Sequence, residues 1–195
     1  MMTSLADCLS SFFVSRSLIP TEEKHIYTYC FEVVISSILA WGSVICIALF
    51  TDTLVQTAFY LAGFFLFRSF AGGYHADTHL GCYVLSILAY SFFLLVVAIF
   101  PAMHYLAAVV VFQIFAFILL WLFSPVDHKN NPFSDELKML LRKKVKILLI
   151  VFSILVLLLI YYNYTHLAFY LSYGCLQAAI SVAVAYILKR KEEKA

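Results

Sequence analysis

Charged residues are scarce in this sequence, and so are glycine and proline. Asp, Glu, Lys and Arg make up 12% of the 195 residues, whereas a soluble globular domain has about 25%, so that class is excluded. Six glycines and four prolines exclude collagen-like repeats and Pro/Gly-rich disordered chains. A net charge of +2 is too small to indicate nucleic acid as a partner.

Hydrophobic residues make up 64% of the chain, and they form runs long enough to cross a bilayer, which takes about 20 residues. The runs lack the alternation of a β-barrel, and backbone polar groups in lipid must bond internally, so the spans are helical. We predict an all-α, polytopic protein that forms a single membrane domain over residues 1–195. Its six transmembrane helices are expected at 29–51, 53–69, 82–100, 104–123, 145–162 and 166–188.

The distribution of Lys and Arg gives the orientation of these spans. None of the 13 basic residues lies in the connections at 51–53, 101–104 and 163–166. Because basic residues gather on the cytoplasmic side, this pattern predicts that the N- and C-termini are both cytoplasmic. The loops at 68–82 and 124–144 are then cytoplasmic as well.

The N-terminal segment 1–25 carries apolar residues at helical spacing. These residues are Leu5, Cys8, Leu9, Phe12 and Phe13. They predict an amphipathic helix, which either lies in the membrane interface in contact with lipids or packs on the helical bundle.

The loop 68–82 holds the residues that are best suited to catalysis. Five scattered cysteines in the chain do not indicate a disulfide framework, but Cys82 follows His75 by seven residues in this loop. A thiol and an imidazole are the components of a cysteine nucleophile with its base. A continuous helix would hold the two roughly 10 Å apart, so Gly72 and Gly73 are expected to let the chain fold back.

The spacing of these residues leaves other interpretations of the loop open. Cys82 at the start of a helix would favour the thiolate form, and Arg68 would either strengthen that effect or bind a substrate carboxylate. His75, Asp77, His79 and Cys82 include enough ligand types for zinc. They match no recognised metal-binding spacing, so we expect neither a metal nor another cofactor. A structural polar cap at a helix end is the remaining alternative.

Two segments together resemble a known family. The first runs from Arg68 through Ala-Gly-Gly-x-His to Cys82, after the second of six spans. The second is 124–132, Ser-Pro-Val-Asp-His-Lys-Asn-Asn-Pro, followed by the basic run Lys138 to Lys146. Both resemble loops of the accessory gene regulator protein B (AgrB) family, and the length and number of spans agree.

The resemblance implies a bacterial multi-pass cysteine endopeptidase that matures a quorum-sensing propeptide of the AgrD type on the cytoplasmic side. By the same resemblance His75 is the base and Cys82 the nucleophile, while Arg68 and Gly73 support the site. Cleavage of the acidic C-terminal tail would leave an acyl-thioester on Cys82, which a thiol of the precursor resolves into a thiolactone ring. A homodimer is consistent with the family.

Several roles remain open at this point. Asp77 and Asp127 are both candidates for a third catalytic residue, and the amides of Gly81 and Cys82 are the favoured oxyanion donors. The basic residues from Lys129 to Lys146 either dock the acidic tail or contact lipid headgroups. A small transporter and a non-enzymatic membrane scaffold are the rival functions. Ring formation and plain cleavage are not distinguished.

Overall fold

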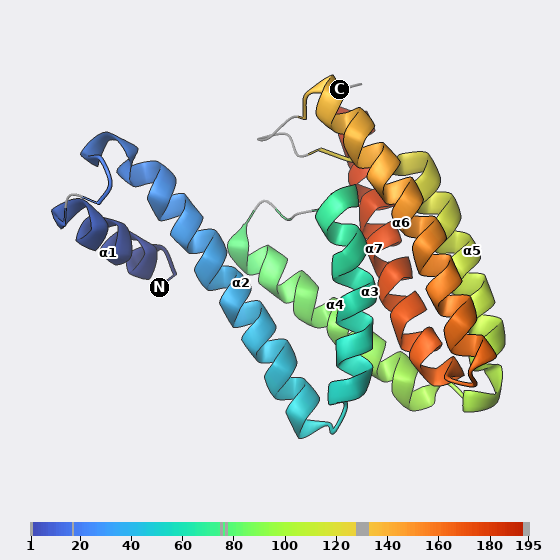
Figure 1. The fold of residues 1–195 in the computed structure, drawn as a ribbon. Coiled ribbons are helices and arrows are strands. Elements are labelled where there is room, and N and C mark those ends of the chain that lie inside the picture. Colours follow the sequence, from blue (N-terminus) through green and yellow to red (C-terminus); the bar gives the residue numbers. More distant parts are fainter. Residues whose placement is uncertain (1, 17, 75, 77, 128–132, 193–195) are drawn as a thin grey trace. The chain divides into compact units, whose positions relative to one another are not determined.

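The computed structural model describes residues 2–16, 18–74, 76, 78–127 and 133–192. Over these residues it contains seven α-helices and two short 3-10 turns (Figure 1). The α-helices are α1 (Met2–Ser15), α2 (Lys24–Phe50), α3 (Leu54–Ala71), α4 (His79–Ile99), α5 (Tyr105–Phe123), α6 (Asp135–Tyr161) and α7 (Thr165–Glu192). Six of the described helices, α2 to α7, are long and apolar enough to cross a membrane. The predicted all-α architecture with six spans is therefore confirmed.

Helix α6 begins at Asp135, ahead of the span predicted at 145–162 and inside the loop predicted at 124–144. The side chain of Ser134 caps this helix by accepting a hydrogen bond from a first-turn amide at 3.3 Å. A side-chain cap stabilises the start of a helix outside the bilayer as well as inside it. A run of apolar residues indicates only the part of the helix that lipid surrounds. The basic run Lys138 to Lys146 consequently lies on the first turns of α6.

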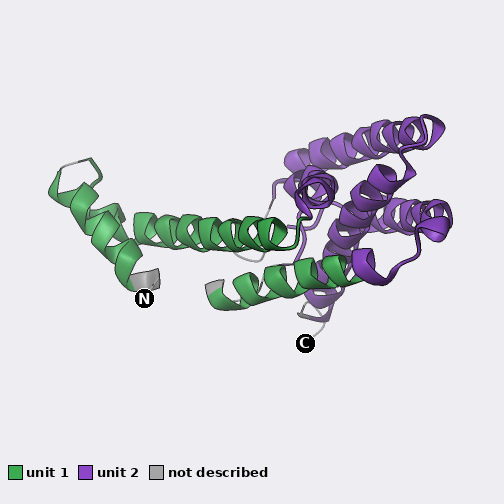
Figure 2. Cartoon of the chain, turned by 90° about the horizontal axis from the view of Figure 1, so that it is seen from below, with its two compact units in different colours: residues 1–52, 76–95 green, residues 53–75, 96–195 purple. Residues whose placement is uncertain are grey.

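The chain groups into two compact units (Figure 2). The first comprises residues 1–52 and 76–95, which include α1, α2 and most of α4. The second comprises residues 53–75 and 96–195, which include α3, α5, α6 and α7.

Helix α7 is the most buried helix of the second unit and contacts α3, α5 and α6. Helix α3 approaches it backbone to backbone. A Cβ atom at Gly63 would collide with the carbonyl oxygen of Leu171, and one at Gly174 would collide with that of Tyr60. Small residues permit such close crossings in membranes, where helices associate through van der Waals contact. The crossing holds the end of α3, which carries Arg68, against α7.

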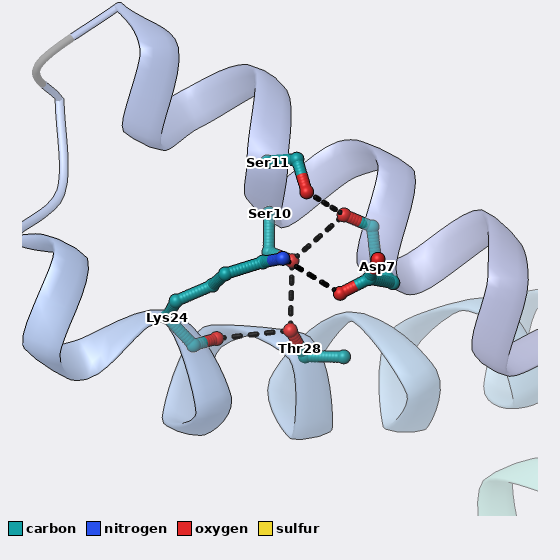
Figure 3. A network of polar contacts seen from close by, with 5 residues as sticks. All are labelled: Asp7, Ser10, Ser11, Lys24 and Thr28. Atoms are coloured by element: carbon teal, nitrogen blue, oxygen red, sulfur yellow. Dashed lines mark hydrogen bonds and ion pairs between the residues drawn. The ribbon is translucent and has the colours of Figure 1, made fainter.

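In the first unit, α1 packs on the start of α2 through a small polar contact (Figure 3). The hydroxyl oxygens of Ser10 and Thr28 lie 2.7 Å apart, and Lys24 pairs with Asp7 at 2.9 Å. On the predicted apolar face, the side chains of Leu5, Leu9 and Phe12 are exposed. A helix is thus present in the N-terminal segment, and its location in the membrane interface stays a prediction.

Candidate active site

Cys82 lies in the first turn of α4, which begins at His79. Thr78 is the N-cap residue of this turn and accepts two hydrogen bonds from it. Its carbonyl oxygen accepts a hydrogen bond from the Cys82 amide at 3.0 Å, and its Oγ1 accepts one from the Gly81 amide at 3.0 Å. The Cys82 residue is half-buried. The predicted position of this cysteine at a helix start is therefore observed.

The same two hydrogen bonds involve the amides that were expected to bind the oxyanion. The amides of Gly81 and Cys82, which the sequence favours as donors, both point to Thr78. A donor already engaged in a helix cap is not free to bind a developing oxyanion, because such binding requires donors aimed at the reacting oxygen. Both amides are engaged in this arrangement of the chain, and the assignment of an oxyanion donor among the amides around Gly81 and Cys82 stays a prediction. The sequence signal for these hydrogen bonds is Thr78, an N-capping residue directly ahead of the helix.

Three predicted site residues, His75, Asp77 and Lys129, lie outside the described residues. The pairing of His75 with Cys82 consequently stays a prediction, as does any role of Asp77. Within the described ranges, no group of three or more His, Cys, Asp or Glu residues could hold a metal ion. The alternative zinc site includes His75 and Asp77, so the described residues do not test it.

Arg68, in the last turn of α3, binds the chain segment that follows this helix. Its guanidinium group donates hydrogen bonds to the carbonyl oxygen of Gly72 at 2.8 Å and to that of Tyr74. A guanidinium presents several donors in a rigid fork, so one side chain can hold two carbonyl groups. The structure thus gives Arg68 a task that was not predicted from the sequence, which is to shape the segment leading to His75.

The two glycines of this segment are required by its backbone and its surroundings. Gly72 has φ of 74° and Gly73 has φ of 136°, values that other residues rarely adopt. A Cβ atom at Gly72 would also collide with the carbonyl oxygen of Val126, and one at Gly73 with the guanidinium of Arg68. Both glycines were predicted to permit an unusual backbone conformation, which the structure shows. Each also allows a neighbouring group to approach closely.

Ala71 and Gly72 of the first motif segment meet Val126 of the second, more than fifty residues later in the sequence, within the second unit. The Val126 amide donates a hydrogen bond to the carbonyl oxygen of Ala71 at 3.0 Å, and Val126 forms an isolated β-bridge with Gly72. The adjoining residue, Asp127, is 8% exposed. This pairing places the Pro-Val-Asp segment directly beside the segment 72–74.

Asp127 is held by groups from several parts of the second unit. Lys189 of α7 donates a hydrogen bond to its carboxylate, Lys138 of α6 pairs with it at 3.3 Å, and the Phe133 amide donates at 3.3 Å. Burial by itself raises the pKa of Asp127, but these hydrogen bonds outweigh it and lower the pKa to about 2. Asp127 is therefore ionised at neutral pH.

Ser181 on α7 completes this arrangement and was missed by the sequence analysis. The Tyr74 amide donates to both the carbonyl oxygen and the Oγ of Ser181, each at 3.1 Å. A serine in an apolar helix has no local signal that marks it as a partner of a distant loop. Its role follows only from the packing of α3 on α7.

Comparison with known proteins gives the family of the chain. The sequence model of the family Accessory gene regulator B matches residues 6–184. The chain belongs to the AgrB family. A Clostridium perfringens (strain SM101) protein described as AgrB-like is 28% identical over 171 residues, which cover 84% of this chain and 80% of the relative. A second AgrB-like protein, from C. perfringens strain 13, is 29% identical over 150 residues, which cover 73% and 70%. No solved structure matches the chain.

Membership of the AgrB family implies a role in the processing of quorum-sensing peptides. Together with six helices able to cross a membrane, it identifies the chain as a multi-pass membrane protein. The predicted resemblance is thereby confirmed at the level of the family.

Proposed function

We propose that this AgrB-family protein is a membrane cysteine endopeptidase that removes the C-terminal tail of an AgrD-type propeptide. Cys82 is the nucleophile and His75 the general base. The observation that carries the proposal is the place of Cys82, a half-buried thiol in the capped first turn of α4. The thiolate of a cysteine is a strong nucleophile toward a peptide carbonyl.

The reaction runs in two acyl transfers. The Cys82 thiolate attacks the carbonyl carbon of the peptide bond before the tail, while His75 holds the proton taken from the thiol. The C–N bond then breaks, and His75 passes its proton to the leaving amine of the tail. The peptide remains bound to Cys82 as a thioester.

A thiol of the same peptide next attacks that thioester and closes a thiolactone ring. Its proton passes to His75, and Cys82 leaves as the thiolate, so the enzyme returns to its starting form. The exchange of one thioester for another keeps the acyl group activated, whereas water would release a linear acid. A site at the membrane surface that excludes water favours the ring.

The proposed orientation puts this chemistry on the cytoplasmic side, with both termini on the same side. Basic residues on the first turns of α6, from Lys138 to Lys146, are then positioned to attract an acidic tail. Lys129 in the preceding loop would add to this charge, and lipid headgroups compete for the same groups. A homodimer is compatible with this assignment.

Co-expression with an AgrD-type propeptide tests the proposal. Mass spectrometry of the peptide should show release of the tail by the wild type, and an intact precursor with Cys82→Ala or His75→Ala. Cys46→Ala is a matched control, because this exposed cysteine lies in α2 and has no proposed role. A scaffold or a transporter would leave the precursor unaltered in every variant. Normal processing by Cys82→Ala would rule out the cysteine mechanism.

A further inference from the structure

The Pro-Val-Asp segment and the segment 72–74 are both attached to α7. At one point the Tyr74 amide bonds to Ser181, and at the other the Asp127 carboxylate bonds to Lys189. Ser181 and Lys189 are eight residues apart in the helix, about 12 Å along its axis.

The contacts close into a ring. From Lys189 the ring passes through Asp127 to Val126, whose amide bonds to the carbonyl oxygen of Ala71. It continues from Ala71 along the chain to Tyr74, where Ser181 returns it to α7. Each of the two segments is thus held both by α7 and by the other segment.

We infer that Asp127 and Lys189 are positioning residues, which hold the Pro-Val-Asp segment against residues 71–74 and so set the place from which His75 follows in the chain. This inference rests on the proposed role of His75. It answers a question that the sequence left open, because it assigns Asp127 to holding the loops and not to acid–base chemistry.

Two observations favour positioning over catalysis for Asp127. Both of its carboxylate oxygens are engaged, Oδ1 by the ammonium of Lys189 and Oδ2 by the ammonium of Lys138 and the amide of Phe133. A catalytic partner of a histidine must instead direct an oxygen at the imidazole. Lys189 has no counterpart in such a mechanism, yet it makes the hydrogen bond that joins the loop to α7.

The test removes the donor at residue 189 and then supplies another. In full-length protein reconstituted in lipid vesicles, Lys189→Ala should lower kcat for propeptide cleavage on the order of 10- to 100-fold, because small misplacements of catalytic groups have such effects. KM should change by less than about threefold, since substrate binding is not the function assigned to the pair. Lys189→Arg should retain most of kcat, because it keeps a cationic donor for the Asp127 carboxylate while Lys138 and the Phe133 amide stay in place.

A second readout does not depend on activity. Hydrogen exchange at residues 71–74 should accelerate in Lys189→Ala and stay near the wild-type rate in Lys189→Arg. The matched control is the ion pair between Asp7 and Lys24, which joins α1 to α2 in the first unit. Lys24→Ala should leave both kcat and the exchange of residues 71–74 unchanged.

The outcomes separate the two proposals. If Lys189→Ala accelerates the exchange of residues 71–74 but cleaves at the wild-type rate, the pair does not position the catalytic groups and the inference is overturned. Unchanged exchange in Lys189→Ala overturns it as well. If Cys82→Ala cleaves normally, the proposed function fails, whereas the exchange rates still decide whether Asp127 and Lys189 hold the two segments together.

Discussion

Substitution of Gly72 by alanine should disconnect the segment 72–74 while leaving the helical bundle folded. The backbone of Gly72, at φ of 74° and ψ of −145°, lies in a region that is essentially restricted to glycine and costs about 1–3 kcal/mol for other residues. The new Cβ atom would also collide with the carbonyl oxygen of Val126. Overpacking of this kind adds about 1–3 kcal/mol.

The total of about 2–6 kcal/mol is of the same order as what the segment gains from its contacts. The amide of Val126 makes one hydrogen bond to Ala71, and that of Tyr74 is shared by two acceptors on Ser181. Arg68 donates two more, to the carbonyl oxygens of Gly72 and Tyr74. At about 0.5–1.5 kcal/mol for each neutral hydrogen bond and about 1.5–3 kcal/mol for each bond from the guanidinium, these contacts contribute on the order of 4–9 kcal/mol. The strain therefore offsets much of this gain, so the segment leaves its place far more often than in the wild type, and the cost to the rest of the fold is limited to the bonds it releases.

We thus expect Gly72→Ala to lower kcat for propeptide cleavage at least tenfold, a loss typical of displaced catalytic groups, with a decrease in Tm of only a few degrees in detergent. Gly42→Ala is the matched control, because no atom lies within 4 Å of the new Cβ atom and the site is inside α2. Alanine there favours the helix by up to about 1 kcal/mol. Wild-type kcat in Gly72→Ala, with the segment still protected from exchange, would refute this reasoning.

Two further predictions concern stability. Gly63→Ala should lower the free energy of unfolding by about 1–3 kcal/mol, because its Cβ atom would force α3 away from the backbone of Leu171; thermal unfolding in detergent measures this, and an unchanged Tm would contradict the close crossing. Because the pKa of Asp127 is about 2 in the folded protein and 3.8 as a free side chain, its ionisation contributes about 2 kcal/mol. That contribution should be constant above about pH 5 and disappear as the pH falls from 4 toward 2. Asp127→Asn should remove this pH dependence, and an Asn variant with the wild-type acid profile would exclude Asp127 as its source.

The six spans could be predicted because lipid imposes one simple demand on the chain. Every backbone polar group in the bilayer must find a partner within its own helix, so runs of apolar residues reveal the spans. The start of α6 at Asp135 could not be found in this way, since Ser134 and the basic turns after it lie beyond the apolar run. Residues 68–82 could be selected as a site because polar groups are costly near a membrane boundary.

The contacts around the site could not be predicted. Val126 and Gly72 lie 54 residues apart and Asp127 and Lys189 lie 62 apart, and neither pair has a local pattern that links its members. Both depend on how α3 crosses α7, which the shapes of Gly63 and Gly174 decide. The cap by Thr78 is different, because a threonine ahead of an apolar helix is a local signal. It could have been used to predict that the amides of Gly81 and Cys82 bond to Thr78.

The most direct test of the central claim is to trap the acyl-enzyme. A propeptide whose own ring-forming thiol is replaced by alanine can be cleaved but cannot close its ring, so the thioester on Cys82 should accumulate. Intact-mass spectrometry of the wild type should then show a protein carrying the peptide without its tail, with peptide mapping placing it on Cys82. Cys82→Ala should show no adduct and no released tail. Release of the tail by Cys82→Ala at the wild-type rate would contradict the account.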